Sequence, residues 1–157
     1  MPKPSPVPPG FHGLTPHITV DGAAKAIAFY RKAFGAAERR RLASPDGKIL
    51  HAELEIENST LMLNDPFPEN PGVLSPQAAK ATTCVLHVYT ADTDAFVKRA
   101  AAAGASVLMP PTDMFWGDRY ASIADPFGHV WGVATRTEDL SDAEVGARAA
   151  AMFGGAR

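Results

Sequence analysis

The sequence has little that would suit a disulfide-bonded, zinc-binding or nucleic-acid-binding protein. Cys84 is its single cysteine, which excludes an internal disulfide and a zinc site of the paired-cysteine type. Cys84 lies in the apolar run 84–88, where a thiol is typically a small core residue rather than a nucleophile. The formal net charge is only -2 at pH 7, so no excess of positive charge attracts nucleic acid or an anionic membrane. We expect neither as a partner, and we predict a reducing, cytoplasmic location.

Long apolar segments are missing as well. No stretch has the length of a secretory signal or of a membrane-spanning helix. Residues 1–12 instead read as a proline-rich tail, with five prolines among the first nine positions, and this composition favours extended backbone. The 157 residues are 46% hydrophobic, which is enough for one well-packed domain or for two small modules that share a core.

The most informative feature that is present is an internal repeat. A strand-like segment that begins at His17, a helical stretch and Gly35 return later as a segment that begins at His87, a second helical stretch and Gly104. Such self-similarity predicts two copies of one supersecondary unit, with a cleft where they meet. Composition then divides the chain into modules at 13–65 and 83–136, a linker at 66–82, and a C-terminal helix and tail at 137–157.

Each module reads as a strand, a helix and further strands. Alternation of polar and apolar residues predicts strands at 14–20, 49–57, 61–63, 85–89, 119–124 and 130–135. Helical periodicity predicts one helix from Ala23 to Gly35 and another from Thr93 to Gly104. Residues 109–118 are expected to form a loop, and a capping box at Ser141 predicts a terminal helix.

Three segments of the chain resemble the vicinal oxygen chelate superfamily, which includes glyoxalase I, bleomycin resistance proteins and extradiol dioxygenases. They are Ala26–Ala36, Asp46–Leu54 and Phe115–His129. They look most like the PhnB-like branch, and the resemblance spans roughly residues 13–136. It implies an α+β fold of two tandem βαβββ modules, whose curved mixed sheets surround a cavity with the helices on the outside.

The less apolar face of each strand should line such a cavity, because the apolar face is needed for packing against the helices. The candidate ligand-binding residues are His17, His51, Glu53, His87, Tyr89, Trp116 and Tyr120. Trp116 either stacks on a planar ligand or covers the end of the sheet. His51 and Glu53 either contact a ligand or form a solvated ion pair. Asp118 and Arg119 are interpreted as a pair that fastens the loop.

The resemblance also raises the question of a metal, since members of this superfamily usually hold one divalent ion. It places the four ligand positions at Thr15, Leu63, Val85 and Gly132. Leucine, valine and glycine have no donor atom in the side chain and threonine is a weak ligand, so we expect no metal there. His17 and His87 occupy equivalent positions two residues further on. Together with Glu53 or Asp65, they are the alternative donor set for a displaced metal.

Three functions follow from these observations. The first is a metal-independent small-molecule binder that sequesters a drug or metabolite and works as a homodimer. The second is a lyase, isomerase or dioxygenase that uses either the displaced metal or acid/base catalysis by histidine. The third is a structural or regulatory dimer. The sequence identifies neither the ligand nor a reaction.

Overall fold

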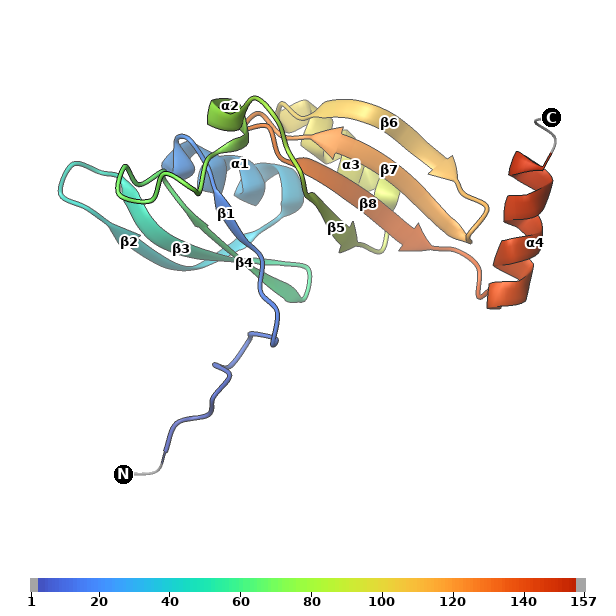
Figure 1. Ribbon diagram of the computed structural model, residues 1–157, viewed down its shortest axis with the longest axis horizontal. Helices are drawn as coiled ribbons and strands as arrows, with labels where there is room; N and C mark the ends of the chain where they lie inside the picture. Colours follow the sequence, from blue (N-terminus) through green and yellow to red (C-terminus); the bar gives the residue numbers. More distant parts are fainter. Residues whose placement is uncertain (1–2, 155–157) are drawn as a thin grey trace. The chain divides into compact units, whose positions relative to one another are not determined.

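The computed structural model describes residues 3–154, which divide into two units at the Thr83–Cys84 bond. Each unit has one four-stranded mixed sheet. Its four strands and the helix that follows the first strand are arranged in the order βαβββ (Figure 1). The expected α+β class and the tandem βαβββ modules are therefore confirmed. The expected cavity between the two modules stays a prediction.

The first unit is built on a sheet whose strand order is β1-β4-β3-β2. β1 is parallel to β4, and the other neighbours are antiparallel. Its elements are β1 (His17–Thr19), α1 (Ala23–Phe34), β2 (Ala37–Ala43), β3 (Ile49–Ile56), β4 (Ser59–Asn64) and the short helix α2 (Pro76–Ala79). The second unit has the equivalent order β5-β8-β7-β6, again with one parallel pair, β5 and β8.

The second unit contains β5 (Val85–Tyr89), α3 (Thr93–Ala103), β6 (Ser106–Asp113), β7 (Asp118–Ala124), β8 (Val130–Arg136) and α4 (Asp142–Phe153). Asp92 caps α3 by accepting a hydrogen bond from the Ala95 amide (2.9 Å), and Gly104 ends it. α4 begins with the capping box that the sequence indicates, formed by Ser141 and Glu144. None of the α4 side chains that the structure describes is buried.

α1 covers one face of the first sheet. Its buried stripe includes Ile27, Tyr30 and Phe34, and the helix ends as expected at Gly35, whose φ of 69° is left-handed. Asp65 fixes the other end of the helix, because its carboxylate accepts hydrogen bonds from the amides of Gly22 (3.0 Å), Ala23 (2.8 Å) and Ile49 (2.7 Å). The carboxylate therefore ties the start of α1 to the start of β3.

Strand periodicity separates a buried face from an accessible face in both sheets. In β3, the side chains of Ala52, Leu54 and Ile56 are buried, whereas those of His51, Glu53 and Glu55 are partly exposed. In β5, Val88 is buried, whereas Val85, His87 and Tyr89 are exposed. Since residues two apart on a strand share a face, the candidate residues of each strand lie together on the accessible side, as alternation predicts.

Several local predictions were wrong. β2 is implied by the βαβββ resemblance but was not located by alternation, because it is an exposed edge strand without apolar alternation. Residues 109–113 belong to the edge strand β6 rather than to a loop, since prolines are tolerated at a sheet edge. α2 lies within the expected linker. Cys84 is exposed rather than a core residue, because it precedes β5 and is not part of the strand.

The helices give no sign of a membrane-spanning segment. In the part of the chain that the structure describes, none is both long enough and apolar enough to cross a bilayer.

Candidate ligand-binding site

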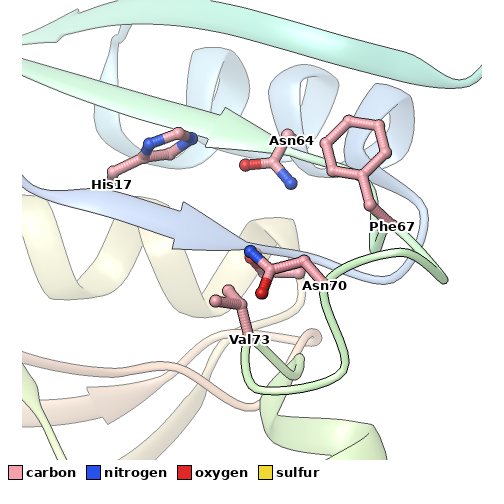
Figure 2. Close-up of a pocket in the computed structure, with 6 residues that line it drawn as sticks. His17, Asn64, Phe67, Asn70 and Val73 are labelled. Carbon is pink, nitrogen blue, oxygen red and sulfur yellow. The ribbon is translucent and has the colours of Figure 1, made fainter.

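A pocket of about 400 Å³ opens on the accessible side of the first sheet. It is lined by His17, Thr19, Asn64, Phe67, Asn70 and Val73. Figure 2 shows His17, Asn64 and Phe67 along one side, with Asn70 and Val73 facing them from the loop that follows β4. The wall therefore combines an imidazole, two amides, a hydroxyl, one aromatic ring and one aliphatic side chain.

β1 and β4 place the polar side chains of this pocket. His17 is paired with Met62 and Thr19 with Asn64 in the parallel ladder, so the two strands present their polar residues on the same face. Asn64 is buried, and its amide nitrogen donates to the backbone oxygen of Asp65 (2.7 Å). This bond fixes the orientation of the Asn64 side chain at the floor of the pocket.

The loop that forms the opposite wall is held by its own hydrogen bonds. The backbone N–H of Asn70 donates to the backbone oxygen of Phe67 (3.0 Å), and the backbone N–H of Val73 donates to the backbone oxygen of Asn70 (3.1 Å). The loop is followed by buried Ser75, whose hydroxyl caps α2 by accepting from the Ala78 amide (3.2 Å). Ser75 thus ties the end of this loop to the first turn of α2.

His17 also belongs to a polar cluster that continues along the same face. The His17 and His51 rings meet edge to face with centroids 6.0 Å apart, and His51 Nε2 lies 3.0 Å from Glu53 Oε1. Arg40 Nη1 lies 4.0 Å from the same Glu53 oxygen. The structure therefore brings together all three candidate residues of the first unit.

The candidate residues of the second unit form an aromatic face on its sheet. His87 lies 4.8 Å from Tyr89 and 5.9 Å from Tyr120, measured between ring centroids, and it is nearly parallel to Tyr120. Trp116 meets Tyr120 edge to face at 5.8 Å. Phe115 extends the ring contacts from Trp116 to Phe153 of α4, at 5.0 and 5.9 Å.

A buried carboxylate, that of Asp118, organises these rings. Its Oδ2 accepts hydrogen bonds from Trp116 Nε1 (3.0 Å) and from the Tyr89 hydroxyl (3.2 Å). Partial burial raises the pKa of Tyr89, and the charge of Asp118 and this hydrogen bond raise it further. The expected pairing of Asp118 with Arg119 was wrong, because neighbouring strand residues point to opposite faces. Arg119 instead binds Asp94 (2.6 Å) and Asp113 (3.2 Å).

Gly132 leaves space for the rings of His87 and Tyr120. A Cβ atom at this position would lie 2.9 Å from His87 Nδ1 and 3.0 Å from a ring carbon of Tyr120. Both distances are shorter than normal van der Waals contact, so a larger residue would displace the two rings. Glycine here permits His87 and Tyr120 to lie directly above β8.

Some residues that line the pocket or contact the rings were not identified by sequence analysis. Asn64 carries a weak signal, because it continues the alternation of Met62 along β4. Phe67 and Asn70 lie in a segment without periodicity, and Asp118 was placed in a loop that is partly a strand. Their positions depend on loop conformation and on contacts distant in sequence, which no local pattern encodes.

A metal site within one unit would need several His, Cys, Asp or Glu side chains close together. Neither unit brings together three or more His, Cys, Asp or Glu side chains that could hold an ion, as far as the described residues go. Asp65 already accepts three backbone hydrogen bonds. Leu63 is buried on the helix side of β4, so the positions that face the accessible side there are Met62 and Asn64. The pair His17 and His87 spans both units and stays a prediction.

Comparison with known proteins gives the family. The model of the glyoxalase/bleomycin resistance protein/dioxygenase superfamily matches residues 12–133. The chain belongs to this superfamily. The resemblance inferred from the three sequence segments is thereby confirmed for the superfamily, and the PhnB-like branch stays a prediction. A solved PhnB protein from Bacillus cereus has a similar fold. That protein is 16% identical, with a TM-score of 0.59 over 79% of this chain and 99% of its own.

Other known proteins are similar over most of this chain. An uncharacterized protein from Mycobacterium tuberculosis (strain H37Rv) is 43% identical over 134 residues, which is 84% of this chain and 79% of that protein. TioX from Micromonospora sp. ML1 is 23% identical, with a TM-score of 0.63 over 83% of this chain and all of its own. A gene product from Arabidopsis thaliana is 27% identical, with the same TM-score over 79% of this chain and 98% of its own.

Proposed function

We propose that this superfamily member binds a small organic molecule, a drug or metabolite that it sequesters without a metal ion, and that it works as a homodimer. The observation that carries the proposal is the pocket on the first sheet. Its volume of about 400 Å³ lies in the range of small-molecule sites. Its wall combines apolar contact from Phe67 and Val73 with polar groups from His17, Asn64 and Asn70.

Each group in the wall has a clear role in binding a ligand. Phe67 offers a ring for stacking. The amide of Asn70 can both donate and accept hydrogen bonds, and His17 adds an imidazole that accepts or donates according to its tautomer. A neutral or weakly polar ligand with a planar portion suits this mixture, because the described wall of the pocket contains no carboxylate and no arginine or lysine.

The test is a screen of small phenols, aromatic amines and aromatic acids by ligand-observed NMR, followed by mapping of backbone amide shifts. We expect at least one compound to bind and to shift the amides of Phe67, Asn70 and Val73. Phe67→Ala should weaken binding of that compound by about twofold to tenfold, since one lost aromatic contact is worth about 0.5–1.5 kcal/mol.

Asn58→Ala is the matched control for Asn70→Ala, because Asn58 lies at the exposed turn before β4 and not in the pocket. We expect Asn70→Ala to weaken binding and Asn58→Ala to leave it unchanged. The proposal fails if no compound in the screen binds at millimolar concentration, or if the two asparagine variants behave alike.

One observation favours an enzyme as the second candidate. Glu53 Oε1 accepts a hydrogen bond from His51 Nε2 (3.0 Å), and His17 lies beside them. A carboxylate that orients an imidazole is the arrangement used in acid/base catalysis by lyases and isomerases. Turnover that disappears in His51→Gln while ligand affinity is retained would favour this candidate over a binding protein.

A metal-dependent enzyme, including a dioxygenase, is tested separately. Elemental analysis of protein purified without chelator, repeated on the double variant His17→Ala/His87→Ala, tests the displaced metal site. Stoichiometric metal that is lost in the double variant would replace our proposal. Metal contents that are equally low in both proteins would support metal-independent binding.

A further inference from the structure

The aromatic face of the second sheet has a charge that its own surroundings do not neutralise. Asp118 is buried beneath Trp116 and Tyr89, and in the described part of the chain it forms no ion pair. Its two side-chain hydrogen bonds come from neutral donors, which share the charge but do not cancel it. A buried carboxylate in this state leaves a negative potential at the surface of the face.

The arginines nearest to this face are occupied elsewhere. Arg136, the ladder partner of Asp118, is paired with Asp139. Arg148 of α4 forms two hydrogen bonds with Glu138, both 2.8 Å long. Each of these arginines has its own carboxylate. Arg136 nevertheless lowers the pKa of Tyr89 through its charge, so it offsets the charge of Asp118 in part without forming an ion pair with it among the described residues.

The rings present the correct surfaces for a positive charge. Aromatic rings are electron-rich on their faces and electron-poor at their edges. Trp116 and Tyr89 direct their polar N–H and O–H edges at Asp118. Neighbouring rings already contact both of them, so a ligand reaches their electron-rich faces only where these contacts leave a face exposed. Tyr89 is 58% exposed, which makes one such face directly accessible.

From this arrangement we infer that the aromatic face formed by His87, Tyr89, Trp116 and Tyr120 binds an organic cation, a quaternary or aromatic ammonium group. The rings supply cation–π contacts, and Asp118 supplies the compensating charge behind them. The inference extends the proposed function by naming a ligand class for a second surface, and so it rests on the protein being a small-molecule binder. An anion is disfavoured by the same negative potential.

Three phenols that differ in charge provide the test. The probes are (3-hydroxyphenyl)trimethylammonium, its neutral isostere 3-tert-butylphenol, and the anion 3-hydroxybenzoate. Backbone amide shifts of the full chain report binding at the aromatic face through Tyr89 and Tyr120, and at the pocket through Asn70 and Val73. We expect the cation to bind the aromatic face at least tenfold more tightly than the neutral isostere.

Asp118→Asn should abolish this preference, because it removes the charge and keeps an oxygen that accepts hydrogen bonds. Asp113→Asn is the matched control, since it removes an exposed carboxylate of the same unit that contacts Arg119 and not the rings, and it should leave binding of all three probes unchanged.

Tyr89→Phe is a change within the face that keeps both the ring and the charge, so the cation should still bind more tightly than the neutral isostere. Gly132→Ala, which displaces His87 and Tyr120, should weaken all probes at this face.

The outcomes separate this inference from the proposed function. Equal binding of cation and neutral isostere, or an unchanged preference in Asp118→Asn, overturns the inference. Binding of any probe at the pocket alone overturns the inference and supports the proposed function. Absence of binding at both surfaces contradicts both. If Asp118→Asn fails to fold, the ratio of cation to neutral affinity in the wild type and in Tyr89→Phe still decides the question.

Discussion

Tyr89 donates its hydroxyl hydrogen bond to a buried carboxylate, and this contact changes how the phenol ionises. Loss of the proton would place a phenolate 3.2 Å from Asp118 in a partly dehydrated setting. The pKa of Tyr89 is therefore raised above its ordinary value of 10.0. Since the folded state holds the proton more tightly than the unfolded chain, this group favours folding below pH 10, and that contribution is lost as pH rises further.

The titration of Tyr89 gives a prediction at the scale of one residue. In protein labelled with ¹³C at tyrosine Cζ, three signals are expected, one for each tyrosine. The signal that disappears in Tyr89→Phe should titrate above pH 10, and in Asp118→Asn it should titrate at a lower pH than in the wild type. A Tyr89 signal that titrates identically in the two backgrounds would show that Asp118 does not act on this phenol.

Individual residues show which parts of the site could be predicted from the sequence. His51, Glu53 and Tyr89 were placed on the accessible faces because strand alternation is a local property with a period of two. Asp118 and Asn64 were not identified, because their roles come from contacts between separate strands and from the end of β4. Their chemistry depends on which groups the fold brings near, and a single sequence does not encode that in any short pattern.

At the scale of elements, the start of α1 depends on a residue 42 positions away. Asp65 accepts from the Ala23 amide over that separation and also holds Ile49 of β3. One carboxylate with two oxygens serves three amide donors, which an asparagine side chain with one oxygen cannot do. The α3 cap is simpler, since Asp92 accepts a single hydrogen bond.

These two caps predict different costs for the same substitution. Asp65→Asn should reduce the free energy of unfolding by about 2 kcal/mol, because buried amide donors lose a charged acceptor. Asp92→Asn should change it by less than about 0.5 kcal/mol, since asparagine caps helices about as well as aspartate. Urea unfolding of both variants measures the difference. Equal losses would mean that Asp65 is no more than an ordinary cap.

The elements that sequence patterns predicted well have either a buried face or a local capping signal. α1 ends at Gly35 as expected, because a left-handed C-cap is a local requirement. α4 begins at its capping box for the same reason. β2 and β6 were missed, because edge strands need not alternate and their pairing is set by the neighbouring strand. The helices were therefore more predictable than the sheet edges.

At the scale of the whole molecule, α4 provides a test of the proposed homodimer. Met152 and Phe153 are 62% and 64% exposed at the end of this helix. Exposed apolar side chains of this size are commonly covered by a partner. If the partner is a second copy of the chain, α4 contributes to the interface.

Sedimentation equilibrium should then give twice the mass of one chain for the wild type. The double variant Met152→Ser/Phe153→Ser should give the mass of one chain at the same concentration. Leu108→Ser is the matched control, because Leu108 is a similarly exposed apolar residue on β6, outside α4. A monomeric wild type would contradict the homodimer, and a dimeric double variant would remove α4 from the interface.

The edge strands β6 and β2 also affect whether the sheets of different molecules can associate. β6 ends the second sheet with Pro110 and Pro111, which have no amide hydrogen to offer to an additional strand. β2 ends the first sheet with three consecutive arginines, Arg39–Arg41, each of which pairs with a glutamate, and charged side chains along an edge strand disfavour the addition of another strand. Both margins therefore discourage the strand-to-strand stacking by which sheet proteins aggregate into fibrils.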